Sequence, residues 1–409
     1  MTALSVPDLD DLLSAEAVDR PFDYYARLRE VGPIRWNDRW HGWMVSGYPE
    51  VVDGFRDHVR LSSEKFAGPF GEELRDAASD YQQLFSFLSK FFVWKDQPYH
   101  TRVRRLVNKA FTPRAVERVR PRVRELVDTL IEQARGQSAM DFLSDFAFTL
   151  PVVVIAEFLG VPAEARDSVR EWSTDLAAVI FVRGDDADRM RKGEESMRRA
   201  EQLLRPLVAA RRREPRDDLL TGLVDAADRT DALTDDEIVA NAILMMFAGH
   251  ETTMNLLANG MVAFSRFTDQ WELLRAEPTL ARGAAEEVLR YDGPMRAQAR
   301  WAKEPLEIAG QRIARGDRVL LMQLAANHDP AGFDDPERLD ITRSPNRHTT
   351  FGQGIHTCLG APLARLEAEE AFAALARAFR GFTVDETEPR YVPTVVSRSL
   401  TALHVTFEP

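Results

Sequence analysis

The chain has 409 residues, of which 44% are hydrophobic and 29% charged, and its formal net charge at neutral pH is −12. This composition is typical of a globular protein, and the acidic balance argues against nucleic acid or anionic lipid as a partner. The only cysteine, Cys358, excludes an internal disulfide and any zinc site that needs two thiolates, which fits a reducing compartment.

The N-terminal part predicts no targeting or membrane segment. Residues 1–20 carry several acids and no long apolar run, and no later stretch approaches ~18 apolar residues. We therefore expect a soluble, cytoplasmic protein without membrane contact. Residues 34–36 and 43–46 predict two short strands of a hairpin. Residues 60–95 lack sustained periodicity but are rich in phenylalanine, which favours either a pocket wall or core packing.

Helical patterns dominate from His100 to about Phe379. A helix over 148–159 is predicted to end at Gly160. Thr234 and Glu237 form a capping box, and the apolar pattern over 238–267 predicts one helix of ~45 Å that must cross the core. Strand patterns return at 306–308, 312–322 and 402–407. We see no repeat or Gly/Ser linker, so residues 1–409 are expected to form a single, mainly helical domain with minor β-structure.

The decisive segment surrounds the cysteine and spells FGQGIHTCLG, followed by Ala-Pro and a helical stretch. Pro362 suits the first turn of a helix, so Cys358 is expected just before a helix N-terminus, where N–H groups and the macrodipole favour a thiolate. Gly352 and Gly354 remove side chains where the backbone must pass close to something flat, and His356 offers a hydrogen-bond donor. A porphyrin with carboxylate arms meets this description. The alternative is a spare buried cysteine in a glycine-rich loop.

This segment resembles the cysteine loop of the cytochrome P450 family, whose pattern F-G-x-G-x-[HR]-x-C-x-G is matched at every specified position. The resemblance covers nearly the whole chain. It implies a triangular, mainly helical fold with a long central helix and small sheets. It also implies a b-type haem bound through the Cys358 thiolate, with Phe351, Gly352, Leu359 and Gly360 beside it, and insertion of one oxygen atom of O2 into the substrate. A thiolate ligand favours O–O cleavage.

The segment AGHETT at 248–253 lies midway along the long predicted helix, where a glycine and two threonines are locally unfavourable. Ala248 and Gly249 could let a ligand approach the helix, and the Thr252 hydroxyl could interrupt its backbone hydrogen bonds. Dioxygen activation needs two protons, so Glu251 and Thr252 are the expected proton-delivery pair. The segment matches the family pattern A-G-x-[DE]-T. The alternative is a solvated glutamate and a threonine bonded to its own helix.

Other residues take their expected roles from the resemblance. His100, Arg104, Arg300 and His356 are expected to hold the haem propionates. Glu287 and Arg290, three residues apart on one helix, are expected to form a buried structural triad with Arg338. Pocket walls are expected at Phe92, Phe181, Leu244, Phe247 and Val396, which favours a lipophilic or aromatic substrate. Arg296 departs from the family's usual residue type and could pair with a substrate group, or face solvent or haem instead.

The chain has no flavin or iron–sulfur motif, so electrons are expected from a separate ferredoxin with its ferredoxin reductase. The docking surface is expected to include Arg102, Arg105, Lys109 and Arg365. Two alternatives remain open. A haem-thiolate peroxygenase or isomerase-like enzyme would dispense with O2 and electron partners, but would not need Glu251 and Thr252. A non-enzymatic haem sensor or carrier would keep Cys358 and the propionate anchors without the acid–alcohol pair.

Overall fold

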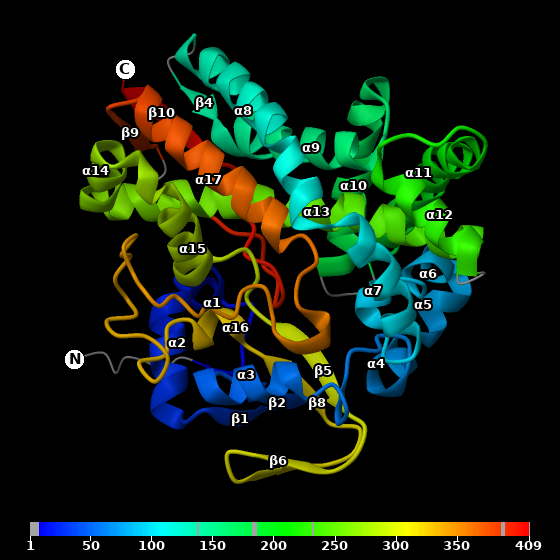
Figure 1. Ribbon diagram of the computed structural model, residues 1–409. Helices are drawn as coiled ribbons and strands as arrows, with labels where there is room; N and C mark the ends of the chain where they lie inside the picture. The colour runs from blue at the N-terminus through cyan, green and yellow to red at the C-terminus, as the bar shows by residue number, and fades with distance from the viewer. Residues whose placement is uncertain (1–7, 137–138, 182–185, 231–232, 386–388, 409) are drawn as a thin grey trace.

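The computed structural model describes residues 8–136, 139–181, 186–230, 233–385 and 389–408 (Figure 1). The helices in the first half are α1 Ala15–Asp19, α2 Pro21–Val31, α3 Tyr48–Arg56, α4 Gly68–Glu73, α5 Arg75–Asp80, α6 Gln82–Leu88, α7 Tyr99–Ala110, α8 Pro113–Arg135, α9 Thr149–Leu159 and α10 Arg166–Phe181. The later helices are α11 Ala187–Arg213, α12 Leu219–Thr230, α13 Asp235–Arg266, α14 Thr268–Ala276, α15 Ala281–Asp292, α16 Gln323–Ala326 and α17 Ala361–Ala378. The strands are β1 Ile34–Asn37, β2 Gly42–Val45, β3 Leu61–Ser62, β4 Met140–Asp141, β5 Gln298–Ala302, β6 Leu306–Ile308, β7 Gln311–Ile313, β8 Arg318–Leu321, β9 Gly381–Val384 and β10 His404–Glu408.

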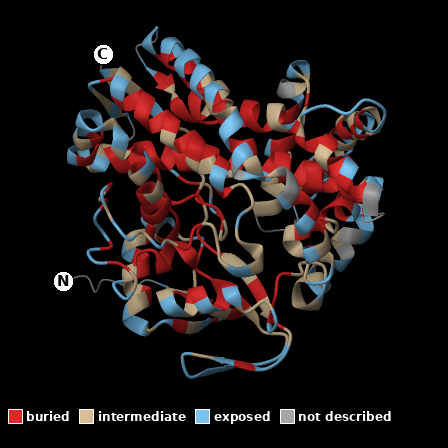
Figure 2. Cartoon of the chain, viewed as in Figure 1, coloured by how far each residue is buried: buried red, intermediate tan, exposed pale blue. Residues whose placement is uncertain are grey.

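Helix α13 is the central element of the helical part. Its 32 residues begin at the predicted capping box, in which the Glu237 backbone N–H donates to Thr234 Oγ1 and the Thr234 N–H donates to the Glu237 carboxylate. Helices α9, α11, α15 and α17 pack against it. From 237 to 264 every residue is buried except Ala248, Gly249 and Thr252. Figure 2 shows buried residues concentrated along α13 and α17. The predicted core-crossing helix is therefore confirmed.

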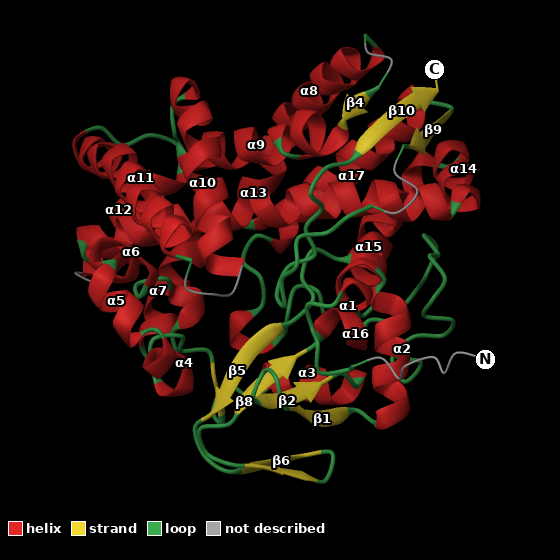
Figure 3. Cartoon of the chain, turned by 180° about the vertical axis from the view of Figure 1, so that it is seen from behind, coloured by secondary structure: helices red, strands yellow, loops and turns green. Residues whose placement is uncertain are grey.

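The strands lie mainly at the opposite end of the molecule, as the view from behind in Figure 3 shows. The largest sheet has the order β1-β2-β8-β5-β3, with β2 and β8 parallel and the other pairs antiparallel. Strands β6 and β7 form a hairpin, and β4, β10 and β9 form a small sheet elsewhere. The loop before α17, orange in Figure 1, lies between the helical part and the large sheet. The molecule is thus mainly helical with minor sheets, as predicted.

Two local expectations differ from the structure. Residues 60–95 contain the short helices α4, α5 and α6 rather than an irregular connector. Strand β5 was not predicted, although it pairs with β8 and β3 and carries Arg300. The predicted hairpin is confirmed as β1 and β2, and the predicted end of α9 is confirmed because Gly160 adopts a left-handed conformation with φ of 86°. Within the described residues, no helix is both long and apolar enough to cross a membrane.

Candidate active site

The cysteine loop has the conformation that its glycines predict. Gly352 and Gly354 adopt φ angles of 64° and 71°, a region that favours glycine. A Cβ on Gly354 would lie 3.0 Å from the backbone oxygen of Phe55 on α3, so this position also requires the absence of a side chain. The Cys358 backbone N–H then donates to Phe351 O at 2.8 Å, which closes the loop. Helix α17 begins at Ala361 with Pro362 in its first turn, as expected.

The Cys358 thiol lies at the N-terminus of α17, and its side chain is exposed on the inner side of the loop. Surrounding protein nevertheless removes most bulk water, and this desolvation raises the pKa of the thiol. Backbone N–H groups of Gly360 and Ala361 bond to the sulfur and, with the Arg104 and Arg365 guanidiniums, act in the opposite direction. The predicted thiolate-stabilising groups are therefore present. Desolvation outweighs them, and a bound metal ion would add a further positive charge that favours the thiolate.

The predicted oxygen-activating segment, 248–253, lies at the place where α13 is not fully buried. Ala248 is exposed and Thr252 is half-buried, although both lie in the middle of a buried helix. Positions four residues apart share one helix face, so these side chains face a common internal space. The Thr252 hydroxyl donates to Ala248 O at 2.8 Å, and the Thr253 hydroxyl donates to Gly249 O at 3.2 Å. The expected interruption of the helix is absent, since α13 is continuous.

Gly249 has a packing role that the sequence did not predict. A Cβ at this position would lie 2.8 Å from Cγ1 of Ile155 on α9. The glycine is thus required for the close packing of α9 against α13, and the admission of a ligand at this position stays a prediction. Its neighbour Ala248 is the residue that borders the open space.

Glu251 is buried and lies next to an equally buried histidine. Nε2 of His250 is 3.5 Å from Glu251 Oε1, while Nδ1 of His250 is 2.8 Å from Met246 O. Because a carbonyl oxygen only accepts, Nδ1 carries a proton, and Nε2 faces the carboxyl group. Asn255 bonds to Glu251 O at 2.8 Å and to Ser399 Oγ at 2.9 Å. The carboxyl group of Glu251 therefore faces His250, while Asn255 holds the backbone carbonyl of the same residue.

The four expected propionate anchors, two arginines and two histidines, lie together near the cysteine loop. The ring centroids of His100 and His356 are 4.1 Å apart. Burial, followed by Arg104, lowers the pKa of His100 to about 4. Burial, followed by Arg300 and His100, lowers the pKa of His356 to about 2. Burial also lowers the pKa of Arg300 to about 10. In each case burial is the largest cause, and it outweighs the opposing effect of the Asp96 carboxylate on His100 and Arg300.

Orphaned polar atoms test whether this place suits haem. Both ring nitrogens of His100 and Nε2 of His356 are buried and have no hydrogen-bond partner among the described residues. An imidazole always has a donor or an acceptor to satisfy, and a haem propionate accepts such bonds. A soft sulfur donor, a cationic group and an open face of α13 are the features that a haem with two carboxylates requires. The residues present fit that group.

The prediction that Arg296 pairs with a substrate group, or faces solvent or haem, is wrong. Its guanidinium is buried and donates to backbone oxygens of Ala17, at 2.6 Å, of Leu12, at 3.4 Å, and of Thr394. These carbonyls satisfy the charge inside the protein, so Arg296 faces neither a substrate, nor solvent, nor haem. Instead it ties helix α1 and the segment before it to the loop at Thr394.

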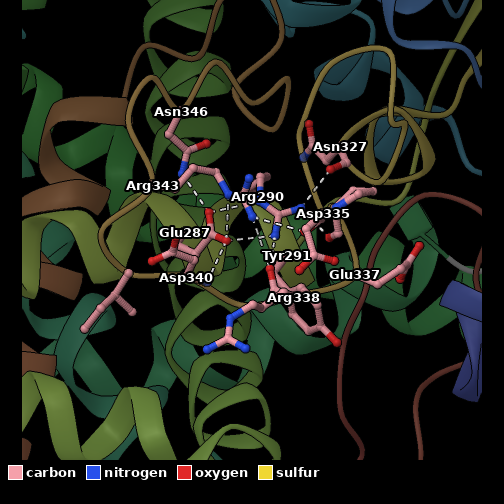
Figure 4. Close-up of polar contacts among 12 residues, drawn as sticks. Glu287, Arg290, Tyr291, Asn327, Asp335, Glu337, Arg338, Asp340, Arg343 and Asn346 are labelled. Atoms are coloured by element: carbon pink, nitrogen blue, oxygen red, sulfur yellow. Dashed lines mark hydrogen bonds and ion pairs between the residues drawn. The ribbon is translucent and has the colours of Figure 1, made fainter.

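The buried ionic group around α15 is partly different from the predicted triad (Figure 4). Arg290 bonds to both oxygens of Glu287 at 2.8 and 2.9 Å, as expected, and both side chains are fully buried. The third member is Arg343, whose Nε lies 3.1 Å from Glu287 Oε1. Arg338 contributes only its backbone oxygen to Arg290, while its guanidinium pairs with exposed Asp269 at 3.1 Å. The prediction for Arg338 is therefore wrong. Only its backbone oxygen, and not its guanidinium, reaches the buried group on α15.

The remaining predicted residues lie in three places. Phe181 on α10 and Phe247 on α13 are in contact, with ring centroids 5.5 Å apart, and Leu244 lies one turn before Phe247 on buried α13. Phe92 is buried beside His100, with ring centroids 5.8 Å apart. Val396 is half-buried, and its oxygen accepts the backbone N–H of Arg296 at 2.8 Å. Phe181 and Phe247 thus form one apolar patch directly before Ala248.

The predicted docking arginines are partly engaged within the protein. Arg102 forms an ion pair with Glu237, and Arg105 is exposed. Arg365 stacks over Phe351 at 4.5 Å and bonds to Glu286 at 2.5 and 3.1 Å. Burial alone would raise the pKa of Glu286, but hydrogen bonds from His348 and Arg365 lower it to about 2. The side chain of Lys109 lies outside the described residues.

The fold and this site together define a haem-thiolate oxidoreductase, and comparison with known proteins agrees. A model of the Cytochrome P450 family matches residues 70–403. The biotin biosynthesis cytochrome P450 of Bacillus subtilis is 37% identical over 398 residues, which cover 97% of this chain and 98% of that protein. The cytochrome P450 monooxygenase PikC of Streptomyces venezuelae is 37% identical over 414 residues, which cover 99% of this chain and 95% of that protein.

Solved structures give the same result. The crystal structure of P450BioI in complex with acyl carrier protein ligated to hexadec-9Z-enoic acid superimposes with a TM-score of 0.88 at 34% identity, covering 98% of this chain and 100% of that chain. The structure of CalO2 has a TM-score of 0.89 at 31% identity and covers 98% of both chains. The chain therefore belongs to the cytochrome P450 family and is an oxidoreductase of the monooxygenase type.

Proposed function

We propose that this chain, acting as a single catalytic domain in the cytoplasm, inserts one atom of O2 into a lipophilic or aromatic small molecule. The product would be a hydroxylated compound of secondary metabolism or catabolism. The observation that carries this proposal is the open face of α13, where Ala248 and Thr252 are accessible beside buried Glu251 in an otherwise buried helix. Haem b, bound through Cys358, would supply the chemistry that activates dioxygen.

Each group in the site has a role that its geometry supports. Cys358 would ligate the iron, and the N–H groups of Gly360 and Ala361 would stabilise its negative charge. His100, Arg104, Arg300 and His356 would neutralise the propionates. Thr252 Oγ1, which donates to Ala248 O, keeps its lone pairs available to accept a further hydrogen bond at the open face. Glu251 lies one residue away and could supply protons to that hydroxyl.

The substrate class rests on the apolar patch before Ala248. Leu244 lies four residues before Ala248 on the same face of α13, and half-buried Phe181 packs against buried Phe247. Apolar walls of this kind favour lipophilic ligands. Relatives named as PikC and as 6-deoxyerythronolide B hydroxylase are consistent with hydroxylation of such molecules. The pocket residues Phe92 and Val396 stay predictions.

Electrons would come from a separate ferredoxin and ferredoxin reductase. Cys358 lies at the start of α17, which carries Arg365, and α7 carries exposed Arg105; we expect these arginines to lie on the docking surface. An acidic ferredoxin would dock there by charge complementarity, so turnover should fall as salt rises. The internal pairing of Arg365 with Glu286 leaves Arg105 as the better single test of docking.

The test is reconstitution with a ferredoxin, its reductase and a nicotinamide reductant, using a panel of macrolide, fatty-acid and aromatic compounds. The proposal is supported if isotopically labelled oxygen from O2 appears in the product, and if this incorporation is lost in Cys358→Ser. Equal turnover with hydrogen peroxide and no ferredoxin would favour the peroxygenase alternative. Bound haem without product under either regime would favour a sensor or carrier. An Arg105→Glu variant should raise the KM for ferredoxin while leaving substrate binding unchanged.

A further inference from the structure

Lys65, which the sequence analysis did not single out, lies beside Arg300, one of the expected propionate anchors. The segment after β3 runs along β5, because Ser62 pairs with Trp301 and the Trp301 indole N–H donates to Glu64 O at 2.9 Å. Lys65 follows immediately. This attachment fixes the lysine next to Arg300 on β5.

Lys65 and Arg300 converge on a single backbone oxygen. Nζ of Lys65 donates to Ala299 O at 2.5 Å, and Nη1 of Arg300 donates to the same oxygen at 3.0 Å. Their charged nitrogens are therefore no further apart than about two hydrogen-bond lengths. The ring of Phe70 lies 4.4 Å from Nζ and limits where the lysine can move. Two cations are thus held together by contacts that do not neutralise either one.

The nearby carboxylates are already engaged with other groups. Glu64 pairs with Lys95, and Asp96 pairs with Lys303 at 3.3 Å and accepts a hydrogen bond from Ser62. In the part of the chain that the structure describes, no carboxylate forms an ion pair with Lys65 or Arg300. Burial, followed by Arg300, lowers the pKa of Lys65 well below its usual value. Among the described residues the pair therefore has no ion-paired carboxylate of its own, and the one carboxylate that acts on Arg300, that of Asp96, is shared with Lys303 and Ser62.

We propose that Lys65 and Arg300 form a two-cation site for one carboxylate group. An anion between the two nitrogens would accept a charge-assisted hydrogen bond from each and remove their repulsion. The carboxylate could belong to a haem propionate or to an acidic substrate. The first source rests on the proposed cofactor, in which Arg300 already has a role, and the second would make the lysine a determinant of substrate class.

The experiment compares Lys65→Met with the wild type and with Lys90→Met. Lys90 is a matched control because its Nζ also donates to a backbone oxygen, that of Ser86 at 2.9 Å, and lies 5.3 Å from the ring of Phe87. No arginine shares that oxygen in the described residues. Lys65→Arg keeps the charge and should behave as the wild type.

The first arm measures haem. Loss of haem from each purified holoprotein to excess apomyoglobin is followed by absorbance, with native haem and with haem dimethyl ester. If the carboxylate is a propionate, Lys65→Met loses native haem on the order of tenfold faster, because one charge-assisted hydrogen bond is gone. The difference disappears with the dimethyl ester. A lysine needed only for folding would accelerate loss of both haems equally, and that result would overturn the haem source.

The second arm measures the substrate. Spectral titration with palmitic acid and with methyl palmitate gives the two dissociation constants for each variant. If the carboxylate belongs to a substrate, the wild type prefers the acid and Lys65→Met loses that preference, while haem loss is unchanged. The proposal is overturned if Lys65→Met equals both the wild type and Lys90→Met in the two arms. If the wild-type protein binds no haem, the proposed function is overturned. The same result also overturns the proposal that the carboxylate is a haem propionate.

Discussion

The buried carboxylate of Glu287 allows a prediction that separates two arginines of the same loop. Glu287 is fully buried and accepts five hydrogen bonds, one of them from Arg343 Nε at 3.1 Å. Arg343 also donates to the backbone oxygens of Asp334 and Asp335. Arg338, in contrast, pairs with Asp269 at 3.1 Å, and both side chains are more than half exposed.

The expected magnitudes follow from burial. Replacing Arg343 with leucine removes one hydrogen bond between charged groups and leaves the buried carboxylate with Arg290 as its remaining cation, so we expect a loss of about 2–3 kcal/mol in the free energy of unfolding. Replacing Arg338 with leucine removes an exposed ion pair and keeps the backbone oxygen that Arg290 needs, so we expect a loss of at most ~1 kcal/mol.

The assay is urea unfolding of the two haem-loaded variants beside the wild type, followed by circular dichroism and by Soret absorbance. Arg343→Leu should unfold at clearly lower urea and retain less haem after purification, while Arg338→Leu should resemble the wild type. The reasoning is refuted if Arg338→Leu is the less stable variant, since the side chain of Arg338 would then hold the group. Equal, small losses for both would show that Arg290 alone stabilises Glu287.

Three other changes test separate parts of the site. Thr252→Ala should leave haem binding intact but divert most reducing equivalents to peroxide, and peroxide yield per reductant consumed measures this; unchanged coupling would remove Thr252 from proton delivery. Gly249→Ala should destabilise the fold because its Cβ would lie 2.8 Å from Cγ1 of Ile155, and the loss in thermal unfolding should be smaller when it is introduced into an Ile155→Ala chain, which lacks that atom; a single variant as stable as the wild type would contradict the packing argument. Glu286→Gln should destabilise the protein at neutral pH, where the ion pair with Arg365 is intact. Because the pKa of Glu286 is lowered to about 2, this difference should shrink as pH falls below the usual value near 4.5, and a difference independent of pH would count against the pairing.

Local sequence patterns predicted the parts of the site that depend on neighbours in the chain. The Cys358 loop needs glycines at 352 and 354 for their backbone conformations, and α13 needs its capping box at Thr234. Both signals lie within a few residues of the feature that they produce. The placement of Ala248 and Thr252 on one open face likewise follows from helical spacing.

The errors concern residues whose partners are remote. Arg296 bonds to carbonyl oxygens near residues 12, 17 and 394, and nothing in its own segment indicates that these three places meet. Arg338 and Arg343 lie in one aperiodic loop, and only the path of its backbone decides which guanidinium reaches Glu287. Gly249 is set by a side chain of α9 that lies almost a hundred residues earlier. Such contacts are properties of the folded chain and have no local pattern.

The central claim is that Cys358 ligates haem iron through its thiolate. The most direct test is the visible absorption spectrum of the purified protein, reduced with dithionite under carbon monoxide, for the wild type and for Cys358→Ser. We predict a strongly red-shifted Soret band for the wild type that is lost in Cys358→Ser. An unshifted, histidine-like band from folded wild-type protein, or a red-shifted band that persists in Cys358→Ser, would contradict the assignment.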